Sequence, residues 1–350
     1  MFKAADRPYS QLSCSEEGDH DDPPTSNADS LQPQRSSPSS YALLVVVCVA
    51  SAIISTLCLT TILIYSARDH AQPSRLCVSP TIRREWRSLT AIEKHEYITA
   101  VKCLYETPSL MGLHSRLDDF TYVHVSQDAH DVASFLPWHR MFLHLYEQSL
   151  AQHCGFKHQL PYWDWSLDWQ NLTGSSIWSN THGFGGENGA SPDSGCVTGP
   201  FADLRVSYDN ETIRPQPHCI TRHFTNIETG EPGSMSGKLI GPDAIGHLGR
   251  SPDYGEFRYE IEGTFHNAIH LQIEGDLNTM AAPNDPLFWL HHVQLDRLWW
   301  KWQQDEPSSR LHDYGQSEEQ PSAAANLEDV LAYSGFASDY TVGDAMFFLS

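Results

Sequence analysis

Residues 265–292 of this 350-residue chain read FHNAIHLQIEGDLNTMAAPNDPLFWLHH. His266 and His270 are four residues apart, so on a helix their side chains project from the same face and can bind one ion. His292 would then reach that ion from the next helix. Neutral imidazole is the commonest metal ligand, and it suits copper, zinc, iron and nickel. This stretch therefore predicts two helices with a metal ion between them.

A second histidine cluster lies earlier in the chain, within VHVSQDAHDVASFLPWHR at residues 123–140. Its members are His124, His130 and His139. Each cluster offers three imidazoles, and neither ligand pattern requires a carboxylate or a thiolate. The sequence therefore predicts two metal ions, each bound by nitrogen, in a paired site.

Apolar residues at helical spacing surround both clusters. Residues 135–154, FLPWHRMFLHLYEQSLAQHC, place large apolar side chains at three- and four-residue steps, with His139 beside them. The same spacing occurs in residues 259–273 and 285–303, and a capping-box pattern at Thr90 begins a further helix. These segments supply the helices that would carry the ligands.

The stretch between about residues 160 and 255 is rich in Gly, Pro, Asn and Ser, which is typical of long loops. Helices that carry ligands on facing sides commonly form bundles with the metal inside. We therefore predict an all-α fold with a four-helix-bundle core that carries a dinuclear metal site. Its connections are expected to be long and irregular.

The N-terminal part of the chain has a different composition. Residues 1–40 are polar, contain few large apolar residues, and are predicted to form a disordered tail. Residues 41–65, YALLVVVCVASAIISTLCLTTILIY, carry no charge and are long enough to cross a bilayer core of roughly 30 Å. We predict a single transmembrane helix there, with a cleaved signal peptide as the alternative. The catalytic domain would occupy residues 66–350, with its core at about 76–345.

The compartment of the large domain is indicated by its modification signals and cysteines. Basic residues on the C-terminal side of residues 41–65 favour a cytoplasmic domain, but sequons at Asn171 and Asn210 favour a lumenal or extracellular one. Five cysteines in this domain also fit an oxidising compartment. We therefore expect a single-pass membrane protein with a lumenal or extracellular catalytic domain. Cys196 and Cys219, both in the loop-rich region, are the pair that we expect to form a disulfide.

The charge of the chain limits the class of its partners. Its formal net charge is −22 at pH 7, and no run of Lys or Arg offers the surface needed to neutralise phosphates. We therefore expect no nucleic-acid partner. The composition suits an enzyme that acts on small molecules, or a soluble carrier.

The residues around the histidines resemble motifs of the tyrosinase family. The motif FLPWHR has a histidine nine residues before its own, and HNAIH is followed 22 residues later by the second histidine of NDPLFWLHH. The segment DRLWWKWQ follows. The resemblance covers roughly residues 76–345 and is strongest to the short fungal tyrosinases and catechol oxidases. It implies two copper ions that bind dioxygen. His124, His130 and His139 would bind the first, and His266, His270 and His292 the second.

Two ligand assignments have alternatives. His291 stands directly before His292, and the 22-residue offset from His270 selects His292 as the ligand, with His291 as a packed or supporting imidazole. Only five residues separate His124 from His130, fewer than the resemblance leads us to expect. His114 is therefore the alternative first ligand.

The resemblance also suggests roles for residues beside the ligands. Family members that hydroxylate monophenols are thought to use a glutamate and an asparagine to hold a water that accepts the phenol proton, and the matching residues are Glu262 and Asn267. A buried structural Glu–Asn pair is the alternative. Leu271 and Phe288 are expected to line the substrate pocket, although both could be core residues. Asp296 is a candidate support for a ligand imidazole, with interhelical ion pairing as the alternative.

Three functions follow from these expectations. The first is a copper oxidase that converts o-diphenols or o-aminophenols, with monophenols as a further candidate substrate, to quinones with dioxygen, in fungal secondary-metabolite or pigment biosynthesis. The second is a zinc-bound enzyme of the same fold that catalyses a non-redox rearrangement in an alkaloid pathway, because imidazoles alone do not select copper over zinc. The third is oxygen binding similar to that of hemocyanin.

Overall fold

The computed structural model describes residues 82–127, 129–187, 195–208, 215–315 and 325–348, together with Val49, Ser51, Ser55 and Thr56. The chain divides into two compact units, Met1–Val78 and Ser79–Ser350, and both histidine clusters belong to the second. The predicted tail at residues 1–40 lies outside the described residues, and so does the predicted span at 41–65 except for those four residues. Within the described part of the chain, no helix has the length and apolar character that crossing a membrane requires.

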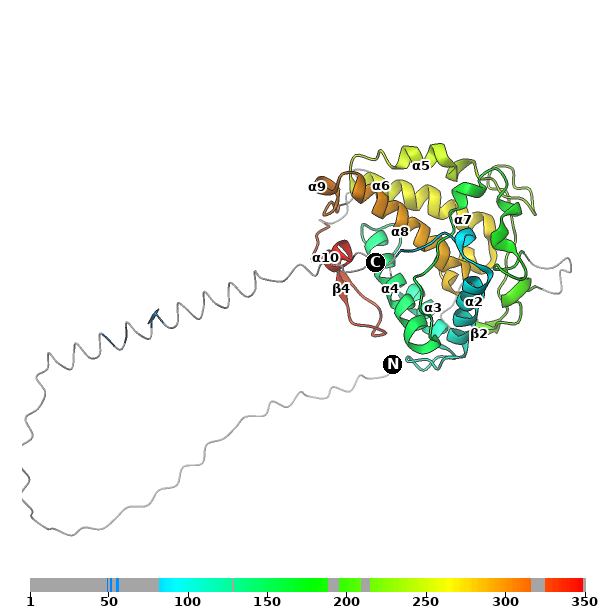
Figure 1. The fold of residues 1–350 in the computed structure, drawn as a ribbon, viewed down its shortest axis with the longest axis horizontal. Coiled ribbons are helices and arrows are strands. Elements are labelled where there is room, and N and C mark those ends of the chain that lie inside the picture. The colour runs from blue at the N-terminus through cyan, green and yellow to red at the C-terminus, as the bar shows by residue number, and fades with distance from the viewer. Residues whose placement is uncertain are drawn as a thin grey trace, which may run out of the picture. The chain divides into compact units, whose positions relative to one another are not determined.

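The second unit is rich in helices, as predicted, and its longest helices lie together (Figure 1). Helix α4 packs against α2, α8 and α10, and α3 packs against α2. The π-helix η7 continues from α6 into α7, and it packs against α8. The α-helices of this unit are α2 (Ala91–Glu106), α3 (Arg116–Ser126), α4 (Phe135–Cys154), α5 (Pro242–Leu248), α6 (Tyr254–Glu260), α7 (Asn267–Ile273), α8 (Leu287–Asp305), α9 (Pro307–Arg310) and α10 (Val342–Phe347). The π-helix η7 is Ile261–His266.

Local sequence signals explain where several of these helices begin. Thr90 and Glu93 form the predicted capping box at the start of α2, each side chain accepting a hydrogen bond from the other residue's backbone N–H. Ser115 and Asp118 form the same arrangement at the start of α3. Gly155 ends α4 with a left-handed conformation, φ 67°, which a residue without Cβ adopts easily. The last two caps set the start of α3 and the end of α4, the helices that carry His124 and His139.

The core between α3, α4 and α8 is aromatic. The rings of Tyr146 and Trp289 stack 3.6 Å apart, and Phe120 meets both rings edge-on at 5.5 Å. All three side chains are fully buried. Large rings with restricted rotamers fix the separation of the helices. The ligand-bearing helices therefore rest on a rigid aromatic layer.

The long loop region is held by short elements that the sequence analysis did not anticipate. Within the described residues, 3-10 helices are η1 (Trp86–Ser88), η2 (Trp165–Asp168), η3 (Leu172–Gly174), η4 (Ser176–Trp178), η5 (Gly199–Phe201), η6 (Lys238–Ile240), η8 (Gly275–Asn278) and η9 (Ala282–Asn284). Two antiparallel two-stranded sheets join β1 (Val206–Tyr208) to β2 (Pro215–His218) and β3 (Val330–Leu331) to β4 (Tyr340–Thr341). The prediction of an all-α fold is therefore accurate for the core but omits these strands. Their few residues carry too little alternation to be detected.

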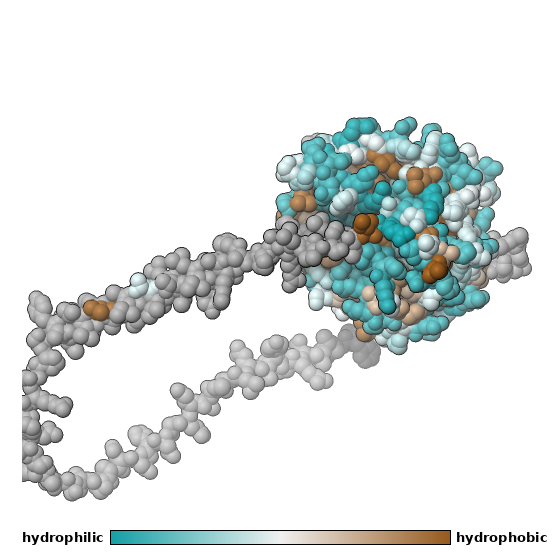
Figure 2. All heavy atoms as spheres, viewed as in Figure 1, coloured by the Kyte–Doolittle hydropathy of each residue, from teal (hydrophilic) through white to brown (hydrophobic). Residues whose placement is uncertain are grey.

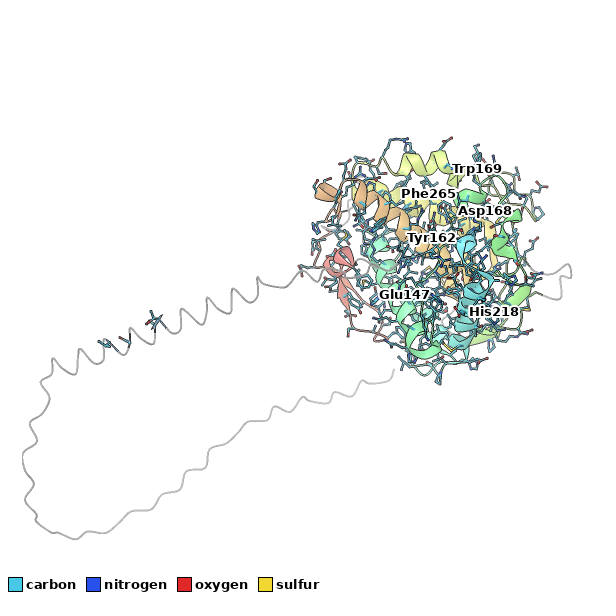
Figure 3. All side chains as sticks on the ribbon, viewed as in Figure 1. Glu147, Tyr162, Asp168, Trp169, His218 and Phe265 are labelled. Atoms are coloured by element: carbon cyan, nitrogen blue, oxygen red, sulfur yellow. A yellow bond between two sulfur atoms is a disulfide. The ribbon has the colours of Figure 1, made fainter. Side chains whose placement is uncertain are left out.

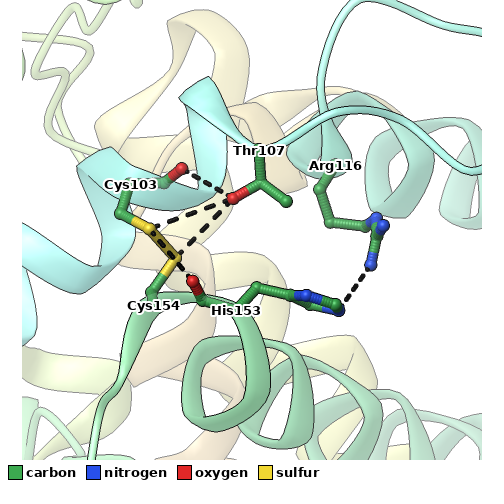
Figure 4. Close-up of a disulfide and its surroundings, with 5 residues drawn as sticks. All are labelled: Cys103, Thr107, Arg116, His153 and Cys154. Atoms are coloured by element: carbon green, nitrogen blue, oxygen red, sulfur yellow. Dashed lines mark hydrogen bonds between the residues drawn. A yellow bond between two sulfur atoms is a disulfide. The ribbon is translucent and has the colours of Figure 1, made fainter.

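Two disulfides are present among the residues that the structure describes. Cys196–Cys219 confirms the predicted pair. Cys103–Cys154 joins the C-terminal ends of α2 and α4, beside Thr107 and His153 (Figure 4). It was not predicted, because only the packing of these helices brings residues 51 positions apart to a Cα separation of 5.8 Å. The visible surface of this unit is mostly hydrophilic, with scattered apolar side chains (Figure 2).

Candidate metal centre

The first cluster is assembled from two helices and the loop between them. His124 lies in the last turn of α3, His139 lies in α4, and His130 lies in the connecting loop. The ligand atoms that the three residues can offer lie within 4.8 Å of one another. The Nε2 atoms of His124 and His139 are 3.4 Å apart. The alternative ligand His114 is exposed in the loop before α3 and does not belong to the cluster.

The second cluster contains four imidazoles. His266 ends the π-helix η7, His270 lies in α7, and His291 and His292 are adjacent in α8. All four side chains are buried, and the ligand atoms that they can offer lie within 4.8 Å of one another. The rings of His139 and His292 stack at 4.4 Å with an interplanar angle of 15°. The two clusters are therefore in direct contact, as a paired metal site requires.

Backbone carbonyl oxygens hold the Nδ1 atoms of three of the clustered histidines. His124 Nδ1 lies 2.7 Å from the Met280 carbonyl oxygen and His139 Nδ1 lies 2.8 Å from that of Phe135. His270 Nδ1 contacts the Leu277 carbonyl oxygen in the same way. A carbonyl can only accept, so in each of these rings Nδ1 carries the proton and Nε2 keeps its lone pair.

These lone pairs fit a metal ion. In the second cluster, the Nε2 atoms of His266, His270 and His292, and also that of His291, are buried and have no hydrogen-bond partner among the described residues. A buried polar atom without a partner costs free energy, and metal coordination would offset that cost. The donor set is nitrogen only, which suits copper or zinc rather than calcium or magnesium.

The hydrogen bonding of His291 separates it from His292. Trp165 Nε1 lies 3.3 Å from His291 Nδ1, and an indole N–H can only donate. His291 Nδ1 must therefore accept, which places the proton of the neutral ring on Nε2. A protonated Nε2 has no lone pair for a metal. This contact supports His292 as the ligand and His291 as a packed imidazole.

Burial keeps the clustered rings neutral. Desolvation, reinforced by repulsion between neighbouring imidazoles, lowers the pKa of His124, His139, His266 and His292 well below 6.5. Desolvation likewise lowers the pKa of His270 to about 4. The neutral form is the one that binds metals. At neutral pH the site is therefore ready to bind a cation without releasing protons from these rings.

Residues 110–305 match the family model described as the common central domain of tyrosinase. The chain belongs to the tyrosinase family. It is 42% identical over 282 residues to tyrosinase-like protein phomQ2 of Diaporthe leptostromiformis, which covers 77% of this chain and 71% of that protein. It is 44% identical over 281 residues to tyrosinase ustQ of Aspergillus flavus, covering 77% of each chain. Both matches extend beyond the central domain.

A solved structure shares the fold. A polyphenol oxidase variant from Thermothelomyces thermophila superposes with a TM-score of 0.65 at 28% identity, covering 80% of this chain and 89% of that one. Together with the relatives, it shows that the chain is an enzyme of the tyrosinase and catechol oxidase kind. Tyrosinase-family proteins bind a dinuclear copper site, and the two histidine clusters fit such a site.

Glu262 and Asn267 of this tyrosinase-family chain are engaged by different partners. Glu262 Oε1 accepts a hydrogen bond of 2.7 Å from the backbone N–H of Asp131, and Oε2 pairs with Arg258 at 2.9 Å. Burial raises the pKa of Glu262 to about 7. Asn267 Oδ1 lies 3.0 Å from His266 Nδ1, so its amide oxygen supports a predicted ligand. The structure thus gives both residues contacts that the resemblance did not imply.

The two residues expected to line the substrate pocket lie in different environments. Phe288 is fully buried, and its ring lies 4.0 Å from His292 and 5.2 Å from His124. Leu271, directly after His270, is 45% exposed. Phe288 therefore packs between the clusters, whereas Leu271 lies on the side open to solvent.

The charged residues near the ligands form ion pairs. Asp296 pairs with Arg140 at 2.6 Å and with Arg83 at 2.9 Å, which is the alternative to supporting an imidazole. Asp285 forms two contacts with Arg222, at 2.6 and 2.7 Å, and both side chains are fully buried. These pairs fix α4 and α8 and the segment before α8.

Several supporting groups were missed by the sequence analysis. The carbonyls of Leu277 and Met280 belong to one segment, η8 to η9, and they hold one histidine of each cluster. Backbone carbonyls leave no residue-specific pattern in a sequence. Trp165 could have been noted only as an aromatic residue in a loop. The ring of Phe265, the residue before His266, lies 5.8 Å from the ring of Trp165. Phe265 is labelled in Figure 3.

Proposed function

We propose that this chain binds two copper ions and oxidises phenolic compounds to quinones with dioxygen. The observation that carries the proposal is the contact between two clusters of imidazoles, most of them buried and neutral, with the His139 and His292 rings stacked across the boundary. His124, His130 and His139 would bind one ion, and His266, His270 and His292 the other. Copper supplies the electron transfer from the phenol to dioxygen.

The surrounding residues hold and shield this site. Backbone carbonyl oxygens orient three of the imidazoles through their Nδ1 atoms, and ring orientation of this kind tunes metal affinity. Phe288 fills the space beside His124 and His292 and excludes water from it. The exposed Leu271 lies one residue from His270, so we place the approach of the phenol ring on that side.

We propose o-diphenols and o-aminophenols as the main substrates. Hydroxylation of a monophenol needs a group that accepts the phenol proton, and a carboxylate with a pKa of about 7 can do so near neutral pH. However, both Glu262 oxygens already have partners, and the Asn267 amide oxygen supports His266. This arrangement favours substrates that already carry two adjacent hydroxyl or amino groups on the ring, because these substrates do not need to be hydroxylated before oxidation.

Metal analysis combined with oxygen uptake tests the proposal. Two copper ions per chain and uptake with catechol are expected. Two copper ions without uptake would indicate an oxygen-binding protein. Zinc at both sites without uptake would refute the oxidase and support a non-redox rearrangement.

We further propose a role in fungal secondary-metabolite or pigment biosynthesis, because the similar proteins quoted above come from fungi. Gene deletion followed by comparison of phenolic metabolites tests this role: accumulation of an unoxidised phenol is expected, and an unchanged profile would refute it.

We also propose that the chain is a single-pass membrane glycoprotein with its catalytic domain in the lumen or outside the cell. The anchor at residues 41–65 rests on sequence alone. The lumenal placement is supported by two disulfides and by the exposure of Asn171, whose side-chain oxygen accepts from Thr173 of its sequon. Resistance to carbonate extraction and a glycosidase-sensitive mobility shift, reduced in Asn171→Gln, are expected. A soluble, unshifted protein would refute both.

A further inference from the structure

Glu262 connects the two histidine clusters. It lies in the π-helix η7 four residues before His266, and its carboxylate accepts a hydrogen bond from the backbone N–H of Asp131, the residue after His130. Glu262 is only 3% exposed. We propose that Glu262, with Arg258 and Tyr254, positions the loop that carries His130, so that the first metal site depends on the helix that carries the second. The proposal rests on the metal-binding role proposed above for His130.

The backbone of His130 is placed differently from the backbones of the other two ligands in its cluster. His124 and His139 lie on α3 and α4, whose backbone hydrogen bonds fix their direction. His130 lies in the loop between these helices, and its side chain is only half-buried. Its ring packs against His124, Phe135 and His139, but the position of its backbone depends on contacts made by the loop.

The loop next to His130 adopts an unfavourable backbone conformation. Asp131 has φ 56°, in the left-handed region, where the Cβ of an L-residue crowds the backbone. Such conformations persist when surrounding contacts enforce them. The 2.7 Å hydrogen bond from Asp131 N–H to Glu262 is a contact of this kind.

The contacts with Asp131 and Ala133 both come from one helical face. Tyr254, Arg258 and Glu262 are spaced four residues apart along α6 and the start of η7, so they lie on one side. The Tyr254 hydroxyl donates to the carbonyl oxygen of Ala133. The loop is thus held at two backbone points, one on each side of Val132.

The ion pair fixes the direction of the Glu262 carboxylate. Arg258 Nη1 lies 2.9 Å from Glu262 Oε2, and both side chains are buried. Buried charges with good geometry have few alternative partners, so the other oxygen stays directed at Asp131. Glu262 is therefore a positioning residue for His130, whether or not it also accepts a proton during turnover.

The test compares three variants of the full chain. Removing Glu262 alone would leave Arg258 buried without its partner, so both are replaced in Arg258→Met/Glu262→Met, which substitutes apolar side chains of similar volume. The matched control is Glu260→Ala, on the same helix, whose carboxylate pairs only with the exposed His247 among the contacts described. The third variant adds Asp131→Gly to the double replacement, because glycine adopts positive φ without steric cost.

Two measurements separate this proposal from the proposed function. Amide exchange of the peptide covering residues 129–135 in metal-free protein reports the loop directly, and Cu²⁺ titration with a competing chelator reports each metal affinity. We expect the double variant to lose protection and to bind one of two ions roughly 10- to 100-fold more weakly, as for other supports of metal ligands. Asp131→Gly should restore at least part of that affinity, and Glu260→Ala should match the wild type.

Each contrary outcome has one meaning. Unchanged protection, unchanged affinity of both sites in the double variant, or no recovery with Asp131→Gly would overturn the positioning role. Should the double variant fail to fold, Tyr254→Phe serves in its place, because it keeps the ring and removes only the hydroxyl that donates to the Ala133 carbonyl. This variant is expected to lower the affinity for the same ion, but to a smaller extent. A wild-type protein that binds fewer than two ions, with loop protection that still depends on Glu262, would refute the proposed function and leave the loop contact standing.

Discussion

Gly275 is the position where a single methyl group should disturb both metal sites. Its φ is 58°, and a Cβ built on it would lie 2.1 Å from the carbonyl oxygen of Thr221. Gly275 begins the η8 helix, which is followed by the carbonyls of Leu277 and Met280 that hold His270 and His124. In Gly275→Ala this segment must move away from Thr221. One displacement would then reorient one ligand of each cluster.

The magnitude follows from the two costs. A left-handed conformation costs an L-residue about 1–2 kcal/mol, and overpacking against a fixed backbone atom costs about 1–3 kcal/mol more. The free energy of unfolding should therefore fall by about 2–5 kcal/mol. Because the Nδ1 contacts would be misdirected, the affinity for both metal ions should also fall by roughly 10- to 100-fold.

Gly112 provides the matched control. It has φ 80°, but a Cβ there would meet nothing within 4 Å. In Gly112→Ala the free energy of unfolding should fall by only about 1–2 kcal/mol, and both metal ions should stay bound. Urea unfolding and metal analysis after chelator dialysis measure the two effects. Equal losses of stability in the two variants, or two tightly bound ions in Gly275→Ala, would refute the reasoning.

Three further outcomes are expected. His292→Ala should lose one bound ion while His291→Ala keeps both, as measured by metal analysis; the reverse would contradict the assignment of the His291 proton to Nε2. Burial lowers the pKa of His270 to about 4, so the neutral form of this ring stabilises the metal-free fold above pH 6.5. As the pH falls from 6.5 to 4, the free energy of unfolding should decrease by on the order of 3 kcal/mol. The melting temperature should fall over the same range, and a flat pH profile would contradict this prediction. Replacing Arg222 by Leu should cost about 3–5 kcal/mol in urea unfolding because it strands the buried Asp285, and adding Asp285→Asn should recover part of this; no recovery would show that the cost lies elsewhere.

The helices and the clusters could be predicted because they depend on local spacing. The i, i+4 pair of His266 and His270 and the apolar period around His139 need no knowledge of distant residues. Tyr254, Arg258 and Glu262 share one helical face because they are four residues apart, which is also a local pattern. The loop that this face contacts is distant in the sequence. Nothing in the sequence near Glu262 indicates that it meets the backbone beside His130.

The features that were missed depend on tertiary packing. The Cys103–Cys154 disulfide forms because α2 and α4 pack with their C-terminal ends together. The supporting carbonyls of Leu277 and Met280 belong to the backbone, so no residue type identifies them. The place of His124 in the first cluster was in question because of its short separation from His130, and it follows from where α3 ends rather than from the count of residues.

The position of the Cys103–Cys154 disulfide has a practical consequence for producing the protein. The bond lies at one end of α4, and His139 lies 15 residues earlier, roughly 22 Å along the helix axis at 1.5 Å per residue. A Cys103→Ala/Cys154→Ala variant should therefore take up metal normally but inactivate sooner during storage or heating. The variant and the wild type would then have the same initial turnover and different working lifetimes.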